Sequence, residues 1–411
     1  MKLLDGKPKP TITVGLESTL DKWITFPSLG DFGKLAQTHK GCFSKYVKDA
    51  FKLLSAGKGD EVSIDGKRAE AQELLKQAKH IGADVKCTLG GNGALEAAAF
   101  KALGSNVIFA GRIFPKQIRE LPPDSRKFFG QVDFSFASAL ENFYPSSYIL
   151  QARGTNRYIL CEGQGRRIEQ LRPYLEKLPD TLEQIMDKYG NLDMINLVGW
   201  QVLFANGIND EDIGVVKKTV NKIRGMVNSP LFTDAGGLAT FNTRDRARLF
   251  QIYSLFDVLS INEDEILQIS KAIGIDTKDE LKIMNHILET SEKLSTIWLH
   301  SLDFQISLSK KYKKELLEKA QIASAAAGAY RVENGNYATL AELNKRIKVK
   351  NYSEKGLRKV KDGTKERVRT KDVELAITPC LVARNFTSTV GAGDVSAAAY
   401  ANVISRAQIK N

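Results

Sequence analysis

Cysteine and histidine are scarce in this chain of 411 residues, which contains four of each. No two cysteines are spaced as C-x-x-C, and no two histidines stand at the spacing of metal ligands. The sequence therefore argues against a disulfide scaffold and against a structural zinc site. The residues concerned are Cys42, Cys87, Cys161 and Cys380, and His39, His80, His286 and His300.

Long apolar runs are also missing. No stretch approaches the roughly 20 apolar residues that a helix needs to cross a bilayer. The first residues, Met1–Pro8, contain no apolar core of the kind found in signal peptides. We therefore expect a soluble, cytoplasmic protein with no membrane partner. The sequence leaves open whether it is a monomer or a dimer.

Acidic residues are outnumbered, and the formal net charge is +12. Much of the excess is local, because the segment from Lys345 to Lys371 holds 12 Lys or Arg against 3 Asp or Glu. Its alternating basic and apolar residues favour a solvated, half-exposed hairpin, and a strip that binds nucleic-acid phosphates is the alternative. Tyr352 is the single aromatic residue there and offers little base stacking, so no nucleic-acid partner is expected.

A regular alternation of short apolar runs and longer stretches of helical period fills most of the chain. It predicts an α/β fold with a three-layer, Rossmann-like large domain around a mainly parallel sheet. The expected strands are Thr11–Leu16, Asn106–Ala110, Met194–Val198, Leu231–Asp234, Val258–Ile261, Thr296–Leu299 and Glu374–Thr378. The expected helices are Asp180–Tyr189, Asp210–Met226, Thr243–Leu255, Glu263–Ile273 and Thr277–Leu294.

Two regions break the alternation and are richer in proline, aromatic and basic residues. They include the strand-like pieces Ser147–Arg153 and Arg157–Cys161 around a Gly-Thr-Asn turn. Because each region leaves and rejoins the α/β pattern, we predict a small, discontinuous β-rich lid that closes over a substrate. The expected division assigns residues 1–18, 46–111 and 168–411 to the large domain, and residues 19–45 and 112–167 to the lid.

A glycine-rich turn near the C-terminus carries the main chemical signal. Residues Ser388–Tyr400 read STVGAGDVSAAAY, a turn that leads into an alanine-rich helix. The glycines let the backbone approach an anion, and the first N–H groups of the helix can hold a phosphoryl group during its transfer. Asp394 can then accept the proton of a hydroxyl that attacks this phosphoryl group. The structural alternative for Asp394 is a helix N-cap.

With this motif the sequence resembles the ribokinase superfamily, and more closely its ADP-dependent glucokinase and phosphofructokinase branch. The resemblance extends from about residue 11 to residue 403 and implies a ribokinase-like fold with a lid. It implies that Asp394 is the catalytic base and that Gly391, Ala392 and Gly393 form the anion hole. Val390 is expected beside the nucleotide.

The resemblance also implies a magnesium ion. Asn262-Glu263-Asp264-Glu265 follows an expected strand and matches the family motif N-x-x-E, so Asn262 and Glu265 are expected to organise the metal. A helix-capping pair is the structural alternative for these two residues. His300-Ser301-Leu302-Asp303 is similar to the family's H-T-x-E element, which implies that His300 contacts the nucleotide and Asp303 supports the metal. Asp303 departs from the family's glutamate.

A third set of matches implies the sugar site. The exit of the first strand suggests Thr19 and Asp21 as sugar contacts, and Leu89-Gly90-Gly91-Asn92-Gly93 suggests Gly91 and Asn92. The segment Gly199-Trp200-Gln201 resembles the family's G-x-Q and adds Gln201. The residues expected at the sugar are Thr19, Asp21, Glu61, Gly91, Asn92 and Gln201. From the lid, Arg166 or Arg167 could reach a nucleotide phosphate and neutralise developing charge.

The resemblance predicts an ADP-dependent sugar kinase that transfers the β-phosphoryl group of ADP to a sugar hydroxyl and releases AMP. Glucose and fructose 6-phosphate are the expected acceptors, and the residues alone do not decide between them. One alternative is an ATP-dependent carbohydrate or nucleoside kinase of the same superfamily. Another is a catalytically silent relative that binds a sugar or a nucleotide.

Overall fold

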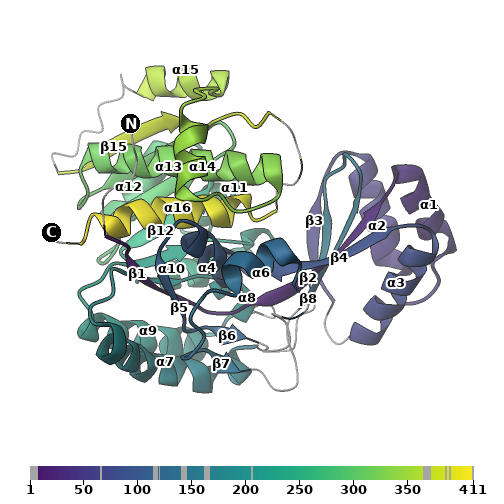
Figure 1. Ribbon diagram of the computed structural model, residues 1–411, viewed down its shortest axis with the longest axis horizontal. Helices are drawn as coiled ribbons and strands as arrows, with labels where there is room; N and C mark the ends of the chain where they lie inside the picture. The colour runs from purple at the N-terminus through teal and green to yellow at the C-terminus, as the bar shows by residue number, and fades with distance from the viewer. Residues whose placement is uncertain are drawn as a thin grey trace.

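The main body of the protein is an eight-stranded sheet between two layers of helices (Figure 1). This computed structural model describes residues 8–64, 67–113, 119, 121–139, 146–161, 167–204, 207–363, 372–384, 387 and 390–409. The strands, in sheet order, are β15 (Glu374–Pro379), β14 (Phe304–Ser309), β13 (Thr296–His300), β12 (Val258–Asn262), β11 (Leu231–Asp234), β10 (Met194–Leu197), β1 (Thr11–Gly15) and β5 (Asn106–Phe109).

All seven strands that the apolar runs predicted lie in this sheet, and their ends differ from the prediction by at most one residue. From β5 to β13 the neighbours pair in parallel, as expected. The strand that the sequence did not reveal is β14, which pairs antiparallel with both β13 and β15. It follows β13 after a short turn instead of a helix, so the alternation of strand and helix fails there.

One layer of helices packs on a core that includes Val14, Phe232 and Trp298. Its helices are α4 (Asn92–Ala102), α6 (Pro123–Phe129), α13 (Lys314–Asn334), α14 (Leu340–Ile347) and α16 (Ala392–Arg406). Helices α13 and α16 lie side by side and present runs of alanine to each other, which lets their backbones approach closely (Figure 1). This packing holds the C-terminal motif against the sheet.

The second layer covers the opposite face and packs on a core that includes Ile195, Leu197 and Ile261. Its helices are α7 (Arg167–Tyr189), α8 (Trp200–Leu203), α9 (Asp210–Met226), α10 (Thr243–Tyr253), α11 (Glu263–Ala272) and α12 (Glu280–Thr290). Several begin at side-chain caps, as Asn209 and Asn262 show by closing capping boxes with the third residue of α9 and α11.

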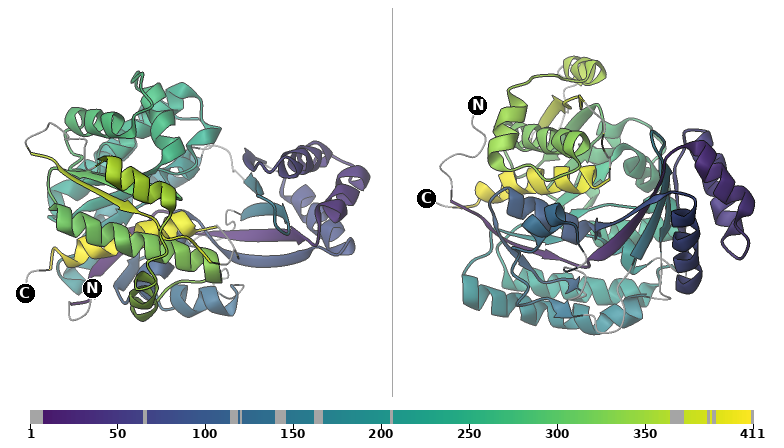
Figure 2. Two further views of the ribbon diagram at one scale, coloured as in Figure 1. Left: turned by 90° about the horizontal axis from the view of Figure 1, so that it is seen from above. Right: turned by 45° about the vertical axis from the view of Figure 1, so that its right-hand side comes forward.

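A smaller unit stands to one side of the main body (Figures 1 and 2). It is a five-stranded sheet of β3 (Asp60–Ser63), β9 (Tyr158–Cys161), β8 (Ser146–Ala152), β2 (Thr19–Phe26) and β4 (Asp84–Gly90), in that order. The helices α1 (Leu29–Thr38), α2 (Ser44–Ser55) and α3 (Arg68–His80) share its own apolar core, which includes Phe32 and Tyr148. We call this unit the lid.

The observed sheets differ from the expected division of the chain in two places. Residues 46–90 had been expected in the large domain, but β3 and β4 pair within the lid sheet, and α2 and α3 pack there. Residues 112–139 had been expected in the lid, but Phe129 of α6 lies in the core of the main body. The amphipathic helices α2 and α3 have the same period as those of the main sheet, so periodicity could not assign them.

The basic segment is not a hairpin where the structure describes it. Its first residues end α14, and a second helix, α15 (Glu354–Gly363), packs against β14 and β15. Residues 364–371 lie outside the described part of the chain. Within the described residues, every helix is too short or too polar to traverse a bilayer.

Two helical glycines should respond in opposite ways to alanine. A Cβ at Gly93 in α4 would stand 2.8 Å from the carbonyl oxygen of Gly15, whereas a Cβ at Gly214 in α9 would meet nothing within 4 Å. We expect Gly93→Ala to destabilise the fold by about 1–3 kcal/mol and Gly214→Ala to stabilise it by about 0.4–1 kcal/mol. Urea unfolding of both variants checks this, and a neutral Gly93→Ala would contradict the close approach of α4 to β1.

Candidate active site

Polar side chains gather at the carboxyl edge of the main sheet. Asp234, Asn262 and His300 end β11, β12 and β13, and Asn262 is in register with His300. Helices α4 and α16 begin at the same edge, since their first turns are joined by a side-chain hydrogen bond. Open α/β sheets bind their ligands in this position.

The first turn of α16 begins at a glycine. Gly391 is the N-cap residue of the helix, with a φ of 70°, and it has no side chain with which to cap the first N–H groups. By contrast, α11, which begins at the same edge of the sheet, is capped by Asn262. The expected anion hole, Gly391, Ala392 and Gly393, therefore lies at an uncapped helix N-terminus, where the backbone N–H groups and the helix dipole favour a negative charge.

Asp394 is held by a short chain of amides. Asn92 Nδ2 donates to Asp394 Oδ1 at 2.8 Å, and Gln201 Nε2 donates to Asn92 Oδ1 at 3.1 Å. These bonds fix the orientation of the carboxylate and keep Asn92 in one orientation. The structure thus brings together three residues that the sequence expected at the active site. Gln201 donates to Asn92, and Asn92 in turn donates to Asp394, so both amides are engaged with protein side chains.

Burial raises the pKa of the Asp394 carboxyl to about 6, against the opposing effects of Asn92 and of the charges on Arg331 and Arg157. A carboxylate with such a pKa is ionised at neutral pH and remains a better proton acceptor than an exposed aspartate. The Asp394 side chain can therefore serve as a general base.

Two further buried carboxyl groups lie beside Asp394. Glu96 of α4 and Asp234 of β11 each offer an oxygen that lies within 4.8 Å of the others and of an oxygen of Asp394. Asn196 Nδ2 donates to Glu96 Oε2 at 2.6 Å. Among the described residues, Glu96 Oε1 and Asp234 Oδ1 have no hydrogen-bond partner. We call Glu96, Asp234 and Asp394 the acidic cluster.

The acidic cluster cannot hold three negative charges without compensation. Burial raises the pKa of Asp234 to about 8, and burial together with the charges of Asp234 and Asp394 raises that of Glu96 well above its usual value. Either protons or a cation must neutralise part of the charge. Carboxylate oxygens at this spacing, two of them unpartnered, fit a hard divalent cation such as Mg²⁺.

The expected sugar contacts lie where the lid joins the main body. Thr19 Oγ1 donates to Asp21 Oδ1 at 3.1 Å, and both side chains are buried. A Cβ at Gly90 would stand 2.1 Å from Asp21 Oδ1, so only glycine leaves room for this carboxylate. Gly91 has a φ of 82° and packs against the backbone of Glu17 and Thr19. The glycine pair thus lets β4 pass close to β2.

The residues expected at the metal have local partners. Asn262 and Glu265 form a capping box in which Glu265 Oε2 accepts from the Asn262 N–H at 3.0 Å. Asp303 accepts from Ser353 Oγ at 2.6 Å and pairs with Lys355 at 3.0 Å, and these two partners lower its pKa. The structure therefore keeps Asp303 at α15, and the carboxylates that it brings together are those of the acidic cluster.

His300 lies beside Asp234 and close to the first turn of α16, since a Cβ at Gly393 would stand 3.8 Å from its Cε1. Its Nε2 is 4.0 Å from Asp234 Oδ1, and its ring contacts Trp298 at a centroid distance of 4.7 Å. Burial lowers the pKa of His300 to about 4, so the imidazole is neutral at pH 7. A neutral His300 can donate or accept a hydrogen bond without adding charge to the site.

Some expected residues cannot be placed in full. Arg166 lies outside the described residues, and so do the side chains of Glu61 and Arg167. Val390 is described, and its carbonyl oxygen accepts from Arg331 Nε at 3.1 Å.

Sequence reasoning missed Glu96, Asp234, Asn196 and Arg331. A signal for Glu96 existed, because it is the one charged residue in the otherwise apolar helical stretch GALEAAAF. A fully buried carboxylate in such a stretch calls for a partner. Asp234 ends an apolar strand at the edge where ligands bind, but the sequence could not show that it faces Glu96 and Asp394.

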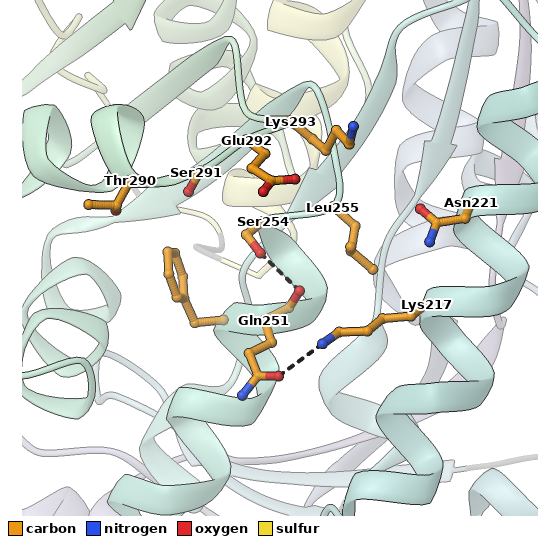
Figure 3. Close-up of a pocket in the computed structure, with 10 residues that line it drawn as sticks. Lys217, Asn221, Gln251, Ser254, Leu255, Thr290, Ser291, Glu292 and Lys293 are labelled. Atoms are coloured by element: carbon orange, nitrogen blue, oxygen red, sulfur yellow. Dashed lines mark hydrogen bonds between the residues drawn. The ribbon is translucent and has the colours of Figure 1, made fainter.

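A cavity of about 320 Å³ lies elsewhere, between α9, α10 and the segment that follows α12 (Figure 3). Its lining includes Lys217, Gln251 and Lys293, and Lys217 Nζ donates to Gln251 Oε1 at 3.2 Å. The lining residues Leu255 and Lys293 shortly precede β12 and β13, so this cavity lies toward the amino edge of the sheet. It is separate from the acidic cluster.

A helix N-terminus with a glycine N-cap, a buried carboxyl group beside it and a lid next to the carboxyl edge of an α/β sheet are features suited to phosphoryl transfer. A family model described as the ADP-specific phosphofructokinase/glucokinase conserved region matches residues 48–402. The chain therefore belongs to the ADP-specific phosphofructokinase/glucokinase family, as the resemblance predicted. It is a phosphotransferase with an alcohol group as acceptor.

Solved structures share the fold. An ADP-dependent kinase in complex with fructose 6-phosphate and ADPβS has a TM-score of 0.73 at 16% identity, covering 98% of this chain and 95% of that one. A phosphofructokinase from Pyrococcus horikoshii OT3 with AMP gives 0.72 at 14%, covering 97% and 98%. An adenosine kinase from Trypanosoma brucei brucei gives 0.51 at 11%, covering 83% and 98%. No curated protein matches the sequence.

The pKa of about 6 for Asp394 predicts the acid limb of the pH profile. Protonation removes the base, so kcat/KM should fall about tenfold per pH unit below pH 6. We expect Asp394→Asn to lower turnover by at least about 10²-fold while the variant stays folded. Phosphoryl-transfer rates between pH 4.5 and 8, with thermal unfolding of the variant as control, check this. A flat profile or a near-normal variant would remove Asp394 as the base.

Proposed function

We propose that this protein transfers the β-phosphoryl group of ADP to a hydroxyl of a sugar and releases AMP. The observation that carries the proposal is the pairing of Asp394 with the uncapped N-terminus of α16. This arrangement sets a proton acceptor next to the first N–H groups of a helix whose N-cap residue is a glycine. Membership of an ADP-specific family supports ADP as the donor.

In the proposed step, a bond forms between the acceptor oxygen and the β-phosphorus of ADP. The bond from that phosphorus to the bridging oxygen of the leaving AMP breaks. Asp394 takes the hydroxyl proton, and the N–H groups of Gly391 to Asp394 stabilise the charge on the moving phosphoryl group. Asn92 and Gln201 keep the carboxylate aimed at the acceptor. Positioning and electrostatic stabilisation supply most of the rate enhancement in such transfers.

Glucose and fructose 6-phosphate are the proposed acceptors. Asp21 and Thr19, at the junction with the lid, offer oxygen atoms suited to sugar hydroxyls. Arg157, at the start of β9, brings positive charge close enough to lower the pKa of Asp394, which suits a phosphorylated acceptor. One structural neighbour is a kinase in complex with fructose 6-phosphate, which supports this sugar phosphate as an acceptor.

We propose Mg²⁺ as the metal. The unpartnered oxygens of Glu96 and Asp234 fit a hard cation, and Glu265 and Asn262 stand at the end of the neighbouring β12. When bound, the ion would neutralise phosphate charge and that of the acidic cluster. Asp303 is held by Ser353 and Lys355. Burial raises the pKa of Glu263, and the negative charge of Asp303 helps to raise it; this electrostatic effect is the only contribution that we propose for Asp303.

The test crosses ADP and ATP with glucose, fructose 6-phosphate and a panel of sugars and nucleosides, in the presence of magnesium. Release of AMP with ADP and one sugar supports the proposal and identifies the acceptor. Turnover only with ATP would indicate an ATP-dependent carbohydrate or nucleoside kinase. Binding of nucleotide without turnover on any acceptor would favour a silent relative.

A stability measurement tests the metal without turnover. The raised pKa of Glu96 means that the folded protein favours the protonated carboxyl group. The stabilisation that this group contributes is therefore present below the pKa of an unfolded glutamate, and it is lost as the pH rises and the group ionises. Without metal, Glu96→Gln should therefore raise the melting temperature at pH 8, and this gain should vanish toward pH 4. Mg²⁺ should stabilise the wild type and not the variant, because a ligand that binds only the folded state raises its stability.

The matched control is Asp212→Asn, which changes an equally buried carboxyl group in the capping box of α9. This variant should keep the full response to Mg²⁺. An equal Mg²⁺ response in wild type and Glu96→Gln would contradict a role for Glu96 in holding the ion.

A further inference from the structure

Arg331 stands behind the glycine turn that precedes α16. It lies in the last turn of α13, and its Nε donates to the carbonyl oxygen of Val390 at 3.1 Å. A Cβ at Gly391 would stand 3.6 Å from Arg331 Nη2 and 3.7 Å from Nε, so the guanidinium lies against the turn itself. Arg331 thus reaches the peptide that leads into the anion hole.

The guanidinium is fixed from two other sides. Its Nη1 donates to the carbonyl oxygen of Gly335 at 2.7 Å, and its central carbon lies 4.9 Å from the centroid of the Tyr337 ring. Bonds to two separate carbonyls and a stack on a ring leave the side chain few alternative rotamers. Arg331 is therefore a rigid support that ties the end of α13 to the start of α16.

The packing of α13 on α16 brings Arg331 to this position. A Cβ at Gly328 would stand 2.5 Å from Ser396 Oγ, and Ser396 Oγ donates to the carbonyl oxygen of Ser324 at 3.3 Å. The two helices therefore touch closely, one turn from Arg331 and one turn from Gly391. Since the N-cap residue of α16 is a glycine without a capping side chain, the tie to Val390 is a contact by which the described protein can set the direction of the first N–H groups of this helix.

We propose that Arg331 is a positioning residue for phosphoryl transfer, which holds the Val390–Gly391 peptide so that the N–H groups of the anion hole face the transferring group. The catalytic consequence of this proposal rests on the proposed function. The contact between Arg331 and the Val390–Gly391 turn rests on geometry alone. Its positive charge also lies near the position where the phosphoryl charge develops, which favours the transition state. Arg331 has a local structural role as well, because it binds the residue that ends α13.

The variants are Arg331→Met, which removes the bonds and the charge, and Arg331→Lys, which keeps the charge but cannot bind both carbonyls. We expect Arg331→Met to lower kcat by roughly 10²-fold, as small misplacements of reacting groups do. The KM for the acceptor should change little, and Arg331→Lys should recover part of the loss. The matched control is Arg224→Met, since Arg224 also binds a backbone carbonyl, that of Leu255, and lies in α9. This control should lose stability but keep its kcat.

Amide hydrogen exchange provides a readout that does not need turnover. The peptide that covers Val390 to Tyr400 should exchange faster in Arg331→Met than in wild type, and Arg224→Met should leave it unchanged. Unaltered exchange in Arg331→Met, or a folded Arg331→Met with the kcat of wild type, would overturn the proposal. If the wild type transfers no phosphoryl group to any acceptor, the proposed function fails, and the exchange measurement still decides whether Arg331 holds the turn.

Discussion

The hydrogen bond between Asn92 and Asp394 is the contact on which the rest of the site depends. It joins residues 302 positions apart, one at the start of α4 and the other in the first turn of α16. Strand β4 belongs to the lid and leads directly into α4. Gly90, at the end of β4, lies against the Asp21 carboxylate, and Asn92, two residues later, bonds to Asp394. The proposed sugar contact Asp21 and the proposed base Asp394 are therefore linked through a short, closely packed piece of backbone.

The acidic cluster lowers the stability of the folded protein. Burying Glu96 and Asp234 beside Asp394 raises the free energy of each charged form, as their raised pKa values show. Hydrophobic residues of similar size would stabilise the folded state more. A cluster of this kind, in which Glu96 and Asp234 each keep an oxygen without a hydrogen-bond partner among the described residues, indicates that the charges serve a ligand.

Seven of the eight strands of the main sheet could be predicted because each is a short apolar run, and the glycine turn could be predicted because its residues are contiguous. The lid boundary could not, because α2 and α3 have the same amphipathic period as the helices of the main sheet. The acidic cluster could not either, since Glu96 and Asp234 come from separate elements and meet only through the packing of α4 on the sheet. The role of Arg331 could not be predicted either, because a basic residue near a helix C-terminus is common.

Two helices that begin at the same edge of the sheet solve the same local problem in opposite ways. At the start of α11, Asn262 and Glu265 satisfy the free N–H groups with their own side chains, so one oxygen of Glu265 is already committed to the backbone. At the start of α16 the N-cap residue is Gly391, which offers the first N–H groups no side-chain acceptor. A glycine in place of a capping side chain costs a helix about a few tenths of a kcal/mol. The support that α16 lacks from a cap must come from elsewhere, and the packing of α13, with Arg331 on the Val390 carbonyl, is where the structure provides it.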